Sequence, residues 1–221
     1  MINLVYYERN LPHYQPPYAT YLVSIRLAGS LPREAYERVQ QEYEDFKRAM
    51  SAKVLSSSKI QQYRERQFQY LIDMDRILDA SQHGPKWLGD DTAAEVVARA
   101  IRVNDKKLYD LLAFTIMPNH VHIVLTLLEQ RTEVRPTTSV PGSQYLLTRI
   151  IRQLKGASAR EANLILNRTG SFWQHESFDH VIRDSAELER ILWYVVENPV
   201  AAGLVTHWKE WRWTYCRDGL L

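Results

Sequence analysis

FTIMPNHVHIVL, residues 114–125, is an apolar stretch broken at its centre by a turn signal and followed by two histidines. Pro118 and Asn119 separate two runs rich in β-branched and aromatic residues, which predicts two antiparallel neighbouring strands. Along the second strand residues i and i+2 share a face, so His120 and His122 project side by side. Two imidazoles on one face make half of a metal site, although two ordinary core or surface histidines have the same spacing.

The segments around this hairpin carry further strand and helix patterns. Strands are predicted at residues 18–28, 107–117, 121–128 and 178–183, and helices at 92–101, 143–166 and 185–198, the last ending before Pro199. The order β-α-β-β-α-β-α predicts an α+β, ferredoxin-like sandwich with an added C-terminal helix.

One long segment departs from this pattern. From Arg33 to about Ala80 the chain is rich in Glu, Gln, Arg, Lys and Tyr, with serines at 56–58, and we expect two helices inserted into the core fold. Residues 130–143 form a polar loop in this interpretation. We therefore expect residues 1–221 to form a single domain with a helical excursion at about 33–80.

Composition sets limits on the function. With 221 residues and 45% hydrophobic content the chain can bury one core, and neither a membrane-length apolar run nor a signal peptide is recognisable, so we expect a soluble cytoplasmic protein with no membrane partner. The single cysteine, Cys216, excludes a disulfide framework and a multi-cysteine zinc site. A net charge of +2 does not by itself indicate nucleic-acid binding.

The distribution of charge is more informative than its total. Between Tyr145 and Arg168 the basic residues face one acid, Glu161. Four of them recur at roughly one helical face and are candidates for contacts with DNA phosphates: Arg149, Arg152, Lys155 and Arg160. A solvated helix face is the alternative.

The helix predicted before Pro199 offers a second set of chemical groups. Tyr194 and Asn198 are spaced i, i+4 and therefore stack on one helical face. If this helix packs beside the histidine strand, Asn198 offers an oxygen as a third metal ligand and Tyr194 points at whatever the metal holds; Glu197 is an alternative ligand. Imidazole nitrogens with an amide oxygen suit Mg²⁺ or Mn²⁺.

The two motifs together resemble a known family. MPNHVHIVL (117–125), FWQHESFDHVIRDSAELERILWYVVENPVAAGLV (172–205) and EWRWTY (210–215) are similar to the single-tyrosine HUH transposases, within them the REP-associated tyrosine transposases. The resemblance implies that His120, His122 and Asn198 hold the metal and that Tyr194 attacks a DNA phosphodiester. Such attack leaves a 5′-phosphotyrosine and a free 3′-OH.

The resemblance also implies a partner and a location. Single-stranded or hairpin DNA carrying a repetitive extragenic palindrome is the expected substrate, which places the protein at the nucleoid, as a monomer or a homodimer. The alternatives are a catalytically silent or domesticated hairpin-binding protein, a nickase of the relaxase or replication-initiator type, and an ordinary metallohydrolase. Four C-terminal aromatic residues either stack on unpaired bases or cover the sheet: Trp208, Trp211, Trp213 and Tyr215.

Overall fold

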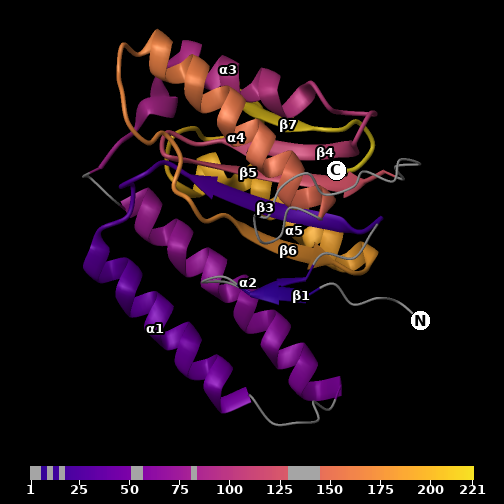
Figure 1. Cartoon of the computed structure of the whole chain (residues 1–221). Coiled ribbons are helices and arrows are strands. Elements are labelled where there is room, and N and C mark those ends of the chain that lie inside the picture. The colour runs from indigo at the N-terminus through magenta and orange to yellow at the C-terminus, as the bar shows by residue number, and fades with distance from the viewer. Residues whose placement is uncertain (1–5, 9–11, 15–17, 51–56, 81–83, 129–144) are drawn as a thin grey trace. The chain divides into compact units, whose positions relative to one another are not determined.

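The computed structural model describes residues 6–8, 12–14, 18–50, 57–80, 84–128 and 145–221, which form two compact units (Figure 1). The first unit comprises Met1–Ala28 and Lys86–Leu221, and the second comprises Gly29–Pro85. The second coincides with the predicted helical excursion, while the assignment of residues 1–221 to a single domain stays a prediction.

The first unit is built on a five-stranded antiparallel sheet. Its strands are β3 (Thr20–Arg26), β4 (Tyr109–Ile116), β5 (His120–Leu127), β6 (Phe178–Ile182) and β7 (Thr214–Cys216), in the order β6-β3-β5-β4-β7. The four predicted strands thus stand in the order fourth, first, third, second, which is the ferredoxin-like arrangement, and the α+β prediction is confirmed. The edge strand β7, which pairs with β4, was not predicted.

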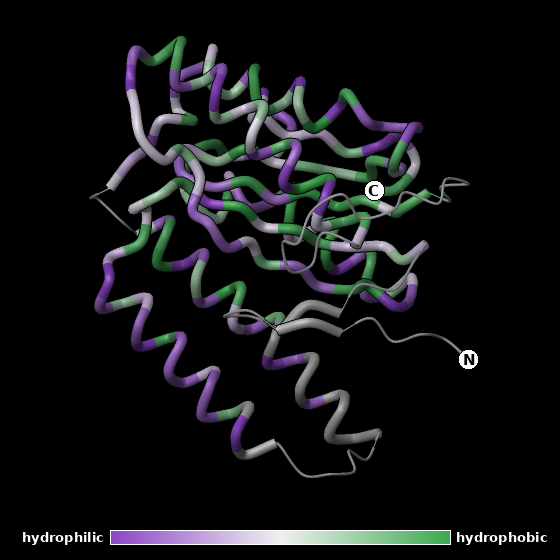
Figure 2. The backbone as a smooth tube through the Cα atoms, viewed as in Figure 1, coloured by the Kyte–Doolittle hydropathy of each residue, from purple (hydrophilic) through white to green (hydrophobic). Residues whose placement is uncertain are grey.

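Helices cover both faces of this sheet (Figure 1). The helix α3 (Asp91–Arg102) packs on α4 (Leu146–Ile165), and both share a core with Val121, Ile123 and Leu125 of β5. The helix α5 (Ser185–Ala201) packs against β4, β5 and β7 on the other face. Hydrophobic residues concentrate along the strands between these layers (Figure 2). Alternation along β5 therefore turns its odd-numbered residues toward α3 and α4 and its even-numbered residues toward α5.

The predicted start of the helix α5 agrees with the structure, but its predicted end does not. At its start, the Asp184 side chain accepts a hydrogen bond from the Glu187 backbone N–H at 2.8 Å and so caps the helix. At its end the prediction was wrong, because the helix does not stop before Pro199 but continues to Ala201. A proline in the last turn removes a single helical hydrogen bond, and the buried Pro199 ring gains packing in exchange.

Short elements complete the first unit. They are a hairpin of β1 (Tyr6–Glu8) and β2 (Pro12–Tyr14) and two 3₁₀ helices, η1 (Trp87–Gly89) and η2 (Trp208–Glu210). The polar loop predicted at 130–143 lies outside the described residues.

The second unit consists of two helices, as predicted. They are α1 (Arg33–Met50) and α2 (Ser57–Ala80), joined through contacts such as that of the Tyr43 and Tyr70 rings, whose centroids are 4.7 Å apart. Asp75 of α2 is a buried carboxylate. Within the described part of the chain, no helix has the length and apolar character needed to cross a membrane.

Candidate metal and tyrosine site

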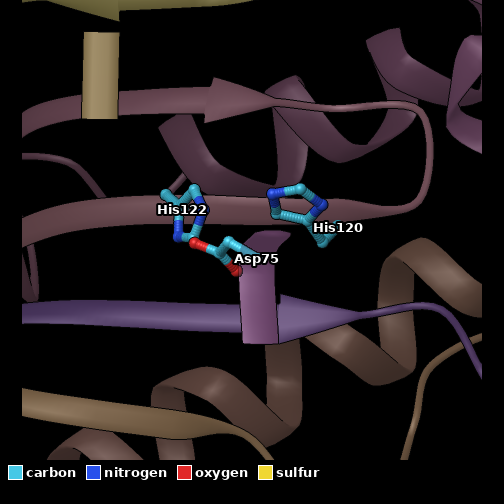
Figure 3. A group of neighbouring side chains, drawn as sticks. All are labelled: Asp75, His120 and His122. Carbon is cyan, nitrogen blue, oxygen red and sulfur yellow. The ribbon is translucent and has the colours of Figure 1, made fainter. Parts of the chain in front are cut away.

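The two histidines of the opening motif lie at the start of β5 on the face that α5 covers. Both are 0% exposed, and their ring centroids are 4.8 Å apart at an interplanar angle of 73°. Figure 3 shows the imidazoles side by side along the strand; Asp75, also drawn there, belongs to the helical unit. The alternation that predicted a shared face is confirmed, and Val121 between them points into the opposite core.

Asn119, the residue before the pair, fixes the chemical form of His120. Its side-chain oxygen lies 2.8 Å from His120 Nδ1, and both residues are buried. Because an amide oxygen only accepts hydrogen bonds, this contact places the imidazole proton on Nδ1 and leaves the Nε2 lone pair as a ligand. In the sequence Asn119 was interpreted only as a turn residue, and its contact with the following side chain carries no periodic signal.

Tyr194 is the part of α5 that meets the histidines. Its ring centroid lies 5.6 Å from that of His122, at 60° to it, and the tyrosine is half-buried. Since α5 follows β6 after a short turn, it runs back toward the end of the sheet that holds His120. Asn198 therefore comes one helical turn beyond Tyr194 in that direction.

Asn198 has the character of a metal ligand. Asn198 is 4% exposed, and its Oδ1 atom has no hydrogen-bond partner among the described residues. A buried carbonyl oxygen left without a donor costs about 1–3 kcal/mol, and a bound cation removes that cost. Glu197, the alternative ligand, is half-buried. Two imidazole nitrogens and an amide oxygen thus fit a divalent cation such as Mg²⁺ or Mn²⁺.

A buried hydrogen-bonded pair of side chains anchors the start of the tyrosine helix. His180 Nε2 on β6 lies 2.9 Å from Glu187 Oε1, and the Arg183 backbone N–H donates to Glu187 Oε2 at 2.9 Å. Burial opposes ionisation of Glu187, but the hydrogen bonds from His180 and from the Arg183 backbone outweigh it and lower the Glu187 pKa to about 2. The pair therefore fixes α5, and with it Tyr194, against the sheet.

The basic residues of α4 fall into two groups. Arg149, Arg152 and Arg160 make no ion pair or side-chain hydrogen bond with the residues that the structure describes. By contrast, the Lys155 ammonium donates to the backbone oxygens of Gln174 at 2.6 Å and His175 at 2.8 Å. Three of the four predicted cations are thus open to an anionic ligand, while Lys155 also ties α4 to the segment before β6.

The C-terminal aromatic residues are used mainly in packing. Trp213 is 7% exposed and its indole N–H donates to Asp91 Oδ1 at 2.9 Å, while the Trp211 indole N–H donates to the Ile116 backbone oxygen at 2.9 Å. For these two tryptophans the structure favours sheet cover over base stacking.

Comparisons with known proteins agree with the fold and the motif. No family model matches the chain. Over 104 residues it is 31% identical to a Haemophilus influenzae protein named as a REP-associated tyrosine transposase, covering 47% of this chain and 56% of that protein. A second protein of that organism, named only as uncharacterized, is 29% identical over 99 residues, covering 39% and 52%. The chain thus spans about half the length of the curated relatives it matches.

A solved structure extends the likeness over the whole fold. It is that of a REP-associated tyrosine transposase bound to a REP hairpin, with a TM-score of 0.50 and 15% identity, covering 94% of this chain and 80% of that one. The sheet and its paired histidines define an α+β protein of the ferredoxin-like class. The chain is thus similar in sequence, over about half of its length, to one protein named as a REP-associated tyrosine transposase, and similar in fold to a second.

Proposed function

We propose that this protein cleaves and rejoins single-stranded DNA beside a hairpin, with Tyr194 as the nucleophile. The observation that carries the proposal is the approach of the Tyr194 ring to His122, the second histidine of a buried same-face pair. A phenol beside two potential metal ligands is the arrangement that attack on a metal-held phosphate requires. The named relatives point to REP-type hairpin DNA as the substrate.

The residues have separate roles in this proposal. His120, His122 and Asn198 hold Mg²⁺ or Mn²⁺, and the ion, when bound, neutralises charge on the phosphate. Tyr194 loses its phenolic proton to solvent, forms the bond from its oxygen to phosphorus, and the bond from phosphorus to the 3′ oxygen breaks. The 3′ oxygen takes up a proton, and the phosphotyrosine keeps the ester for rejoining.

The direct test is cleavage of the DNA that flanks the gene. Single-stranded oligonucleotides carrying each flanking hairpin are end-labelled, incubated with the protein and Mg²⁺ or Mn²⁺, and separated on a denaturing gel. We expect cleavage at one position beside a hairpin, its loss with EDTA and its return when Mn²⁺ is added back. Cleavage that persists undiminished in EDTA contradicts the metal assignment.

A second prediction concerns the open arginines of α4. We expect Arg152→Glu to weaken binding to all DNA sequences alike and to lower the slope of log affinity against log salt by about 0.7 or more, because one phosphate contact is lost. Lys107→Glu is the matched control, since Lys107 is an exposed cation in the turn between α3 and β4 whose ammonium donates to the Val103 backbone oxygen. Equal salt slopes for the two variants would show that Arg152 is an ordinary surface residue.

A further inference from the structure

One arginine stands on the strand beside the histidine pair. Arg26 is the last residue of β3, and its partner in the antiparallel register with β5 is His120, the first residue of that strand. Figure 1 shows β3 and β5 as neighbours in the sheet. Residues directly opposite each other in an antiparallel pair project to the same face. The Arg26 side chain therefore lies on the face of the two histidines, which α5 covers with Tyr194.

Backbone hydrogen bonds fix the position of Arg26 relative to His120. The Leu27 backbone N–H donates to the Asn119 backbone oxygen at 2.9 Å, so the neighbouring position is the hydrogen-bonded one and Arg26–His120 is a non-hydrogen-bonded pair. In such a pair the Cα atoms are only about 4.5 Å apart and the side chains are at their closest. On its other side, the Arg26 backbone oxygen accepts a hydrogen bond from the Gln174 backbone N–H at 2.8 Å. The root of the arginine is thus held beside the first histidine.

Arg26 also differs in charge from the rest of the sheet. The strands β3 to β7 contain a single lysine or arginine, and it is Arg26. The other even-numbered residues of β3, which share its face, are uncharged: Thr20, Leu22 and Ser24. Arg26 is half-buried, so its guanidinium is partly removed from water. The sheet therefore places its one permanent positive charge at the strand end that holds His120.

This charge has a consequence for the metal site. The histidines are proposed ligands of a divalent cation, so the guanidinium lies beside a second positive charge when the site is loaded. Like charges at short range repel each other, and burial strengthens the repulsion. An anion between them turns the repulsion into attraction on both sides. A phosphodiester fits this place because it has two non-bridging oxygens, one for the metal ion and one for the planar guanidinium.

We propose that Arg26 binds the scissile phosphate of the DNA and stabilises its charge while Tyr194 attacks. The inference rests on the proposed function, because it assumes a phosphate held at the histidines. As the bond from the tyrosine oxygen to phosphorus forms, the non-bridging oxygens carry the charge of the transition state. A guanidinium already in place there lowers the energy of that state without reorganisation. Arg26 thereby differs from the arginines of α4, a helix that packs on the opposite face of the sheet.

The first measurement is of binding and does not depend on cleavage. Fluorescence anisotropy in Mn²⁺ compares Tyr194→Phe with Arg26→Ala/Tyr194→Phe, so that the DNA stays intact. The ligands are hairpins with a single-stranded flank in which each phosphate in turn is replaced by a neutral methylphosphonate. We expect Arg26→Ala to weaken binding of the all-phosphate hairpin about tenfold, the usual effect of losing a charged hydrogen bond. At one position of the flank, the methylphosphonate should abolish this difference.

Arg102→Ala, in the same Tyr194→Phe background, is the matched control. The Arg102 guanidinium lies 4.7 Å from the centroid of the Phe114 ring, which belongs to the core on the opposite face of the sheet. An arginine is thus removed without a change at the histidines. We expect this variant to bind every hairpin of the series as tightly as Tyr194→Phe alone.

The second measurement is of cleavage and separates a phosphate contact from a structural role. On the phosphate substrate with Mn²⁺, Arg26→Ala should cleave about a hundredfold or more slowly than the wild type, with unchanged Mn²⁺ affinity in calorimetry. Arg26→Lys keeps the charge and should lose less. With a methylphosphonate at the cleavage position, one diastereomer lacks the oxygen that faces Arg26. We expect the wild type and Arg26→Ala to cleave that diastereomer at equal rates.

The outcomes distinguish this proposal from the function on which it rests. An equal rate deficit of Arg26→Ala on the phosphate and on both diastereomers overturns the proposal, as does a binding series in which no position removes the dependence on Arg26. If neither protein cleaves either diastereomer, the binding series decides. If circular dichroism shows that Arg26→Ala does not fold, Arg26→Gln replaces it in both measurements. A wild type that binds no hairpin DNA contradicts the proposed function instead.

Discussion

Replacing Tyr194 with phenylalanine is expected to abolish the covalent protein–DNA adduct while leaving hairpin affinity unchanged. The substitution removes only the phenolic oxygen, and the ring that packs beside His122 is kept. Because the attacking atom is lost, adduct formation should fall by a factor on the order of a thousand or more. The adduct is measured by SDS gel electrophoresis after incubation with a hairpin substrate labelled on the 5′-phosphate side of the cut.

Tyr215→Phe provides the matched control for this experiment. Tyr215 lies in β7, and its ring stacks on Phe114 with centroids 5.6 Å apart, on the sheet face that α3 and α4 cover. The same atom is therefore removed from a packed tyrosine on the face opposite the histidines. We expect this variant to form the adduct at the wild-type rate. An adduct that persists in Tyr194→Phe moves the nucleophile to another tyrosine. A wild type that binds hairpins and forms no adduct with either metal supports the silent hairpin-binding protein.

The sequence predicts the parts of this fold that periodicity controls. Runs rich in β-branched and aromatic residues identify β4 and β5 together with the Pro118–Asn119 turn, and the same-face geometry of the histidines follows from the strand period alone. Helical spacing likewise aligns Tyr194 with Asn198 on α5 before any packing is known. Each of these features is local, so it is encoded within a few residues.

Features that depend on contacts between residues distant in the chain cannot be predicted from local sequence patterns. The strand β7 has three residues, too few for a recognisable alternation, and exists because it pairs with β4. The bonds from Lys155 to Gln174 and His175 span about twenty positions, so a charge pattern cannot reveal them. The pairing of Val23 with Asp179 between β3 and β6 likewise joins residues far apart in the chain.

The sequence also leaves two candidates for the third metal ligand, Asn198 and Glu197, and substitution distinguishes between them. Asn198→Ala is expected to weaken Mn²⁺ binding, because it removes a buried oxygen that has no other partner among the described residues. Glu197→Gln keeps the size of a half-buried side chain and serves as the comparison. Loss of Mn²⁺ binding only in the glutamate variant would move the third ligand to Glu197.

Substitution of both histidines is expected to have the other large effect, on metal binding and on DNA cleavage. His120→Ala combined with His122→Ala is expected to eliminate Mn²⁺ binding, measured by calorimetry, and to lower DNA cleavage by a factor on the order of a hundred or more, since both imidazole ligands of β5 are removed. His175→Ala is the control, because its imidazole is 77% exposed and outside β5. Circular dichroism checks that the variants fold. A further pair of variants tests Asn119: Asn119→Asp keeps an oxygen acceptor for His120 Nδ1 and should bind Mn²⁺, whereas Asn119→Leu should bind Mn²⁺ more weakly. Unchanged Mn²⁺ binding in the double histidine variant would mean that the pair is a packing feature of the core, and the metal assignment and the cleavage chemistry built on it would both have to be given up.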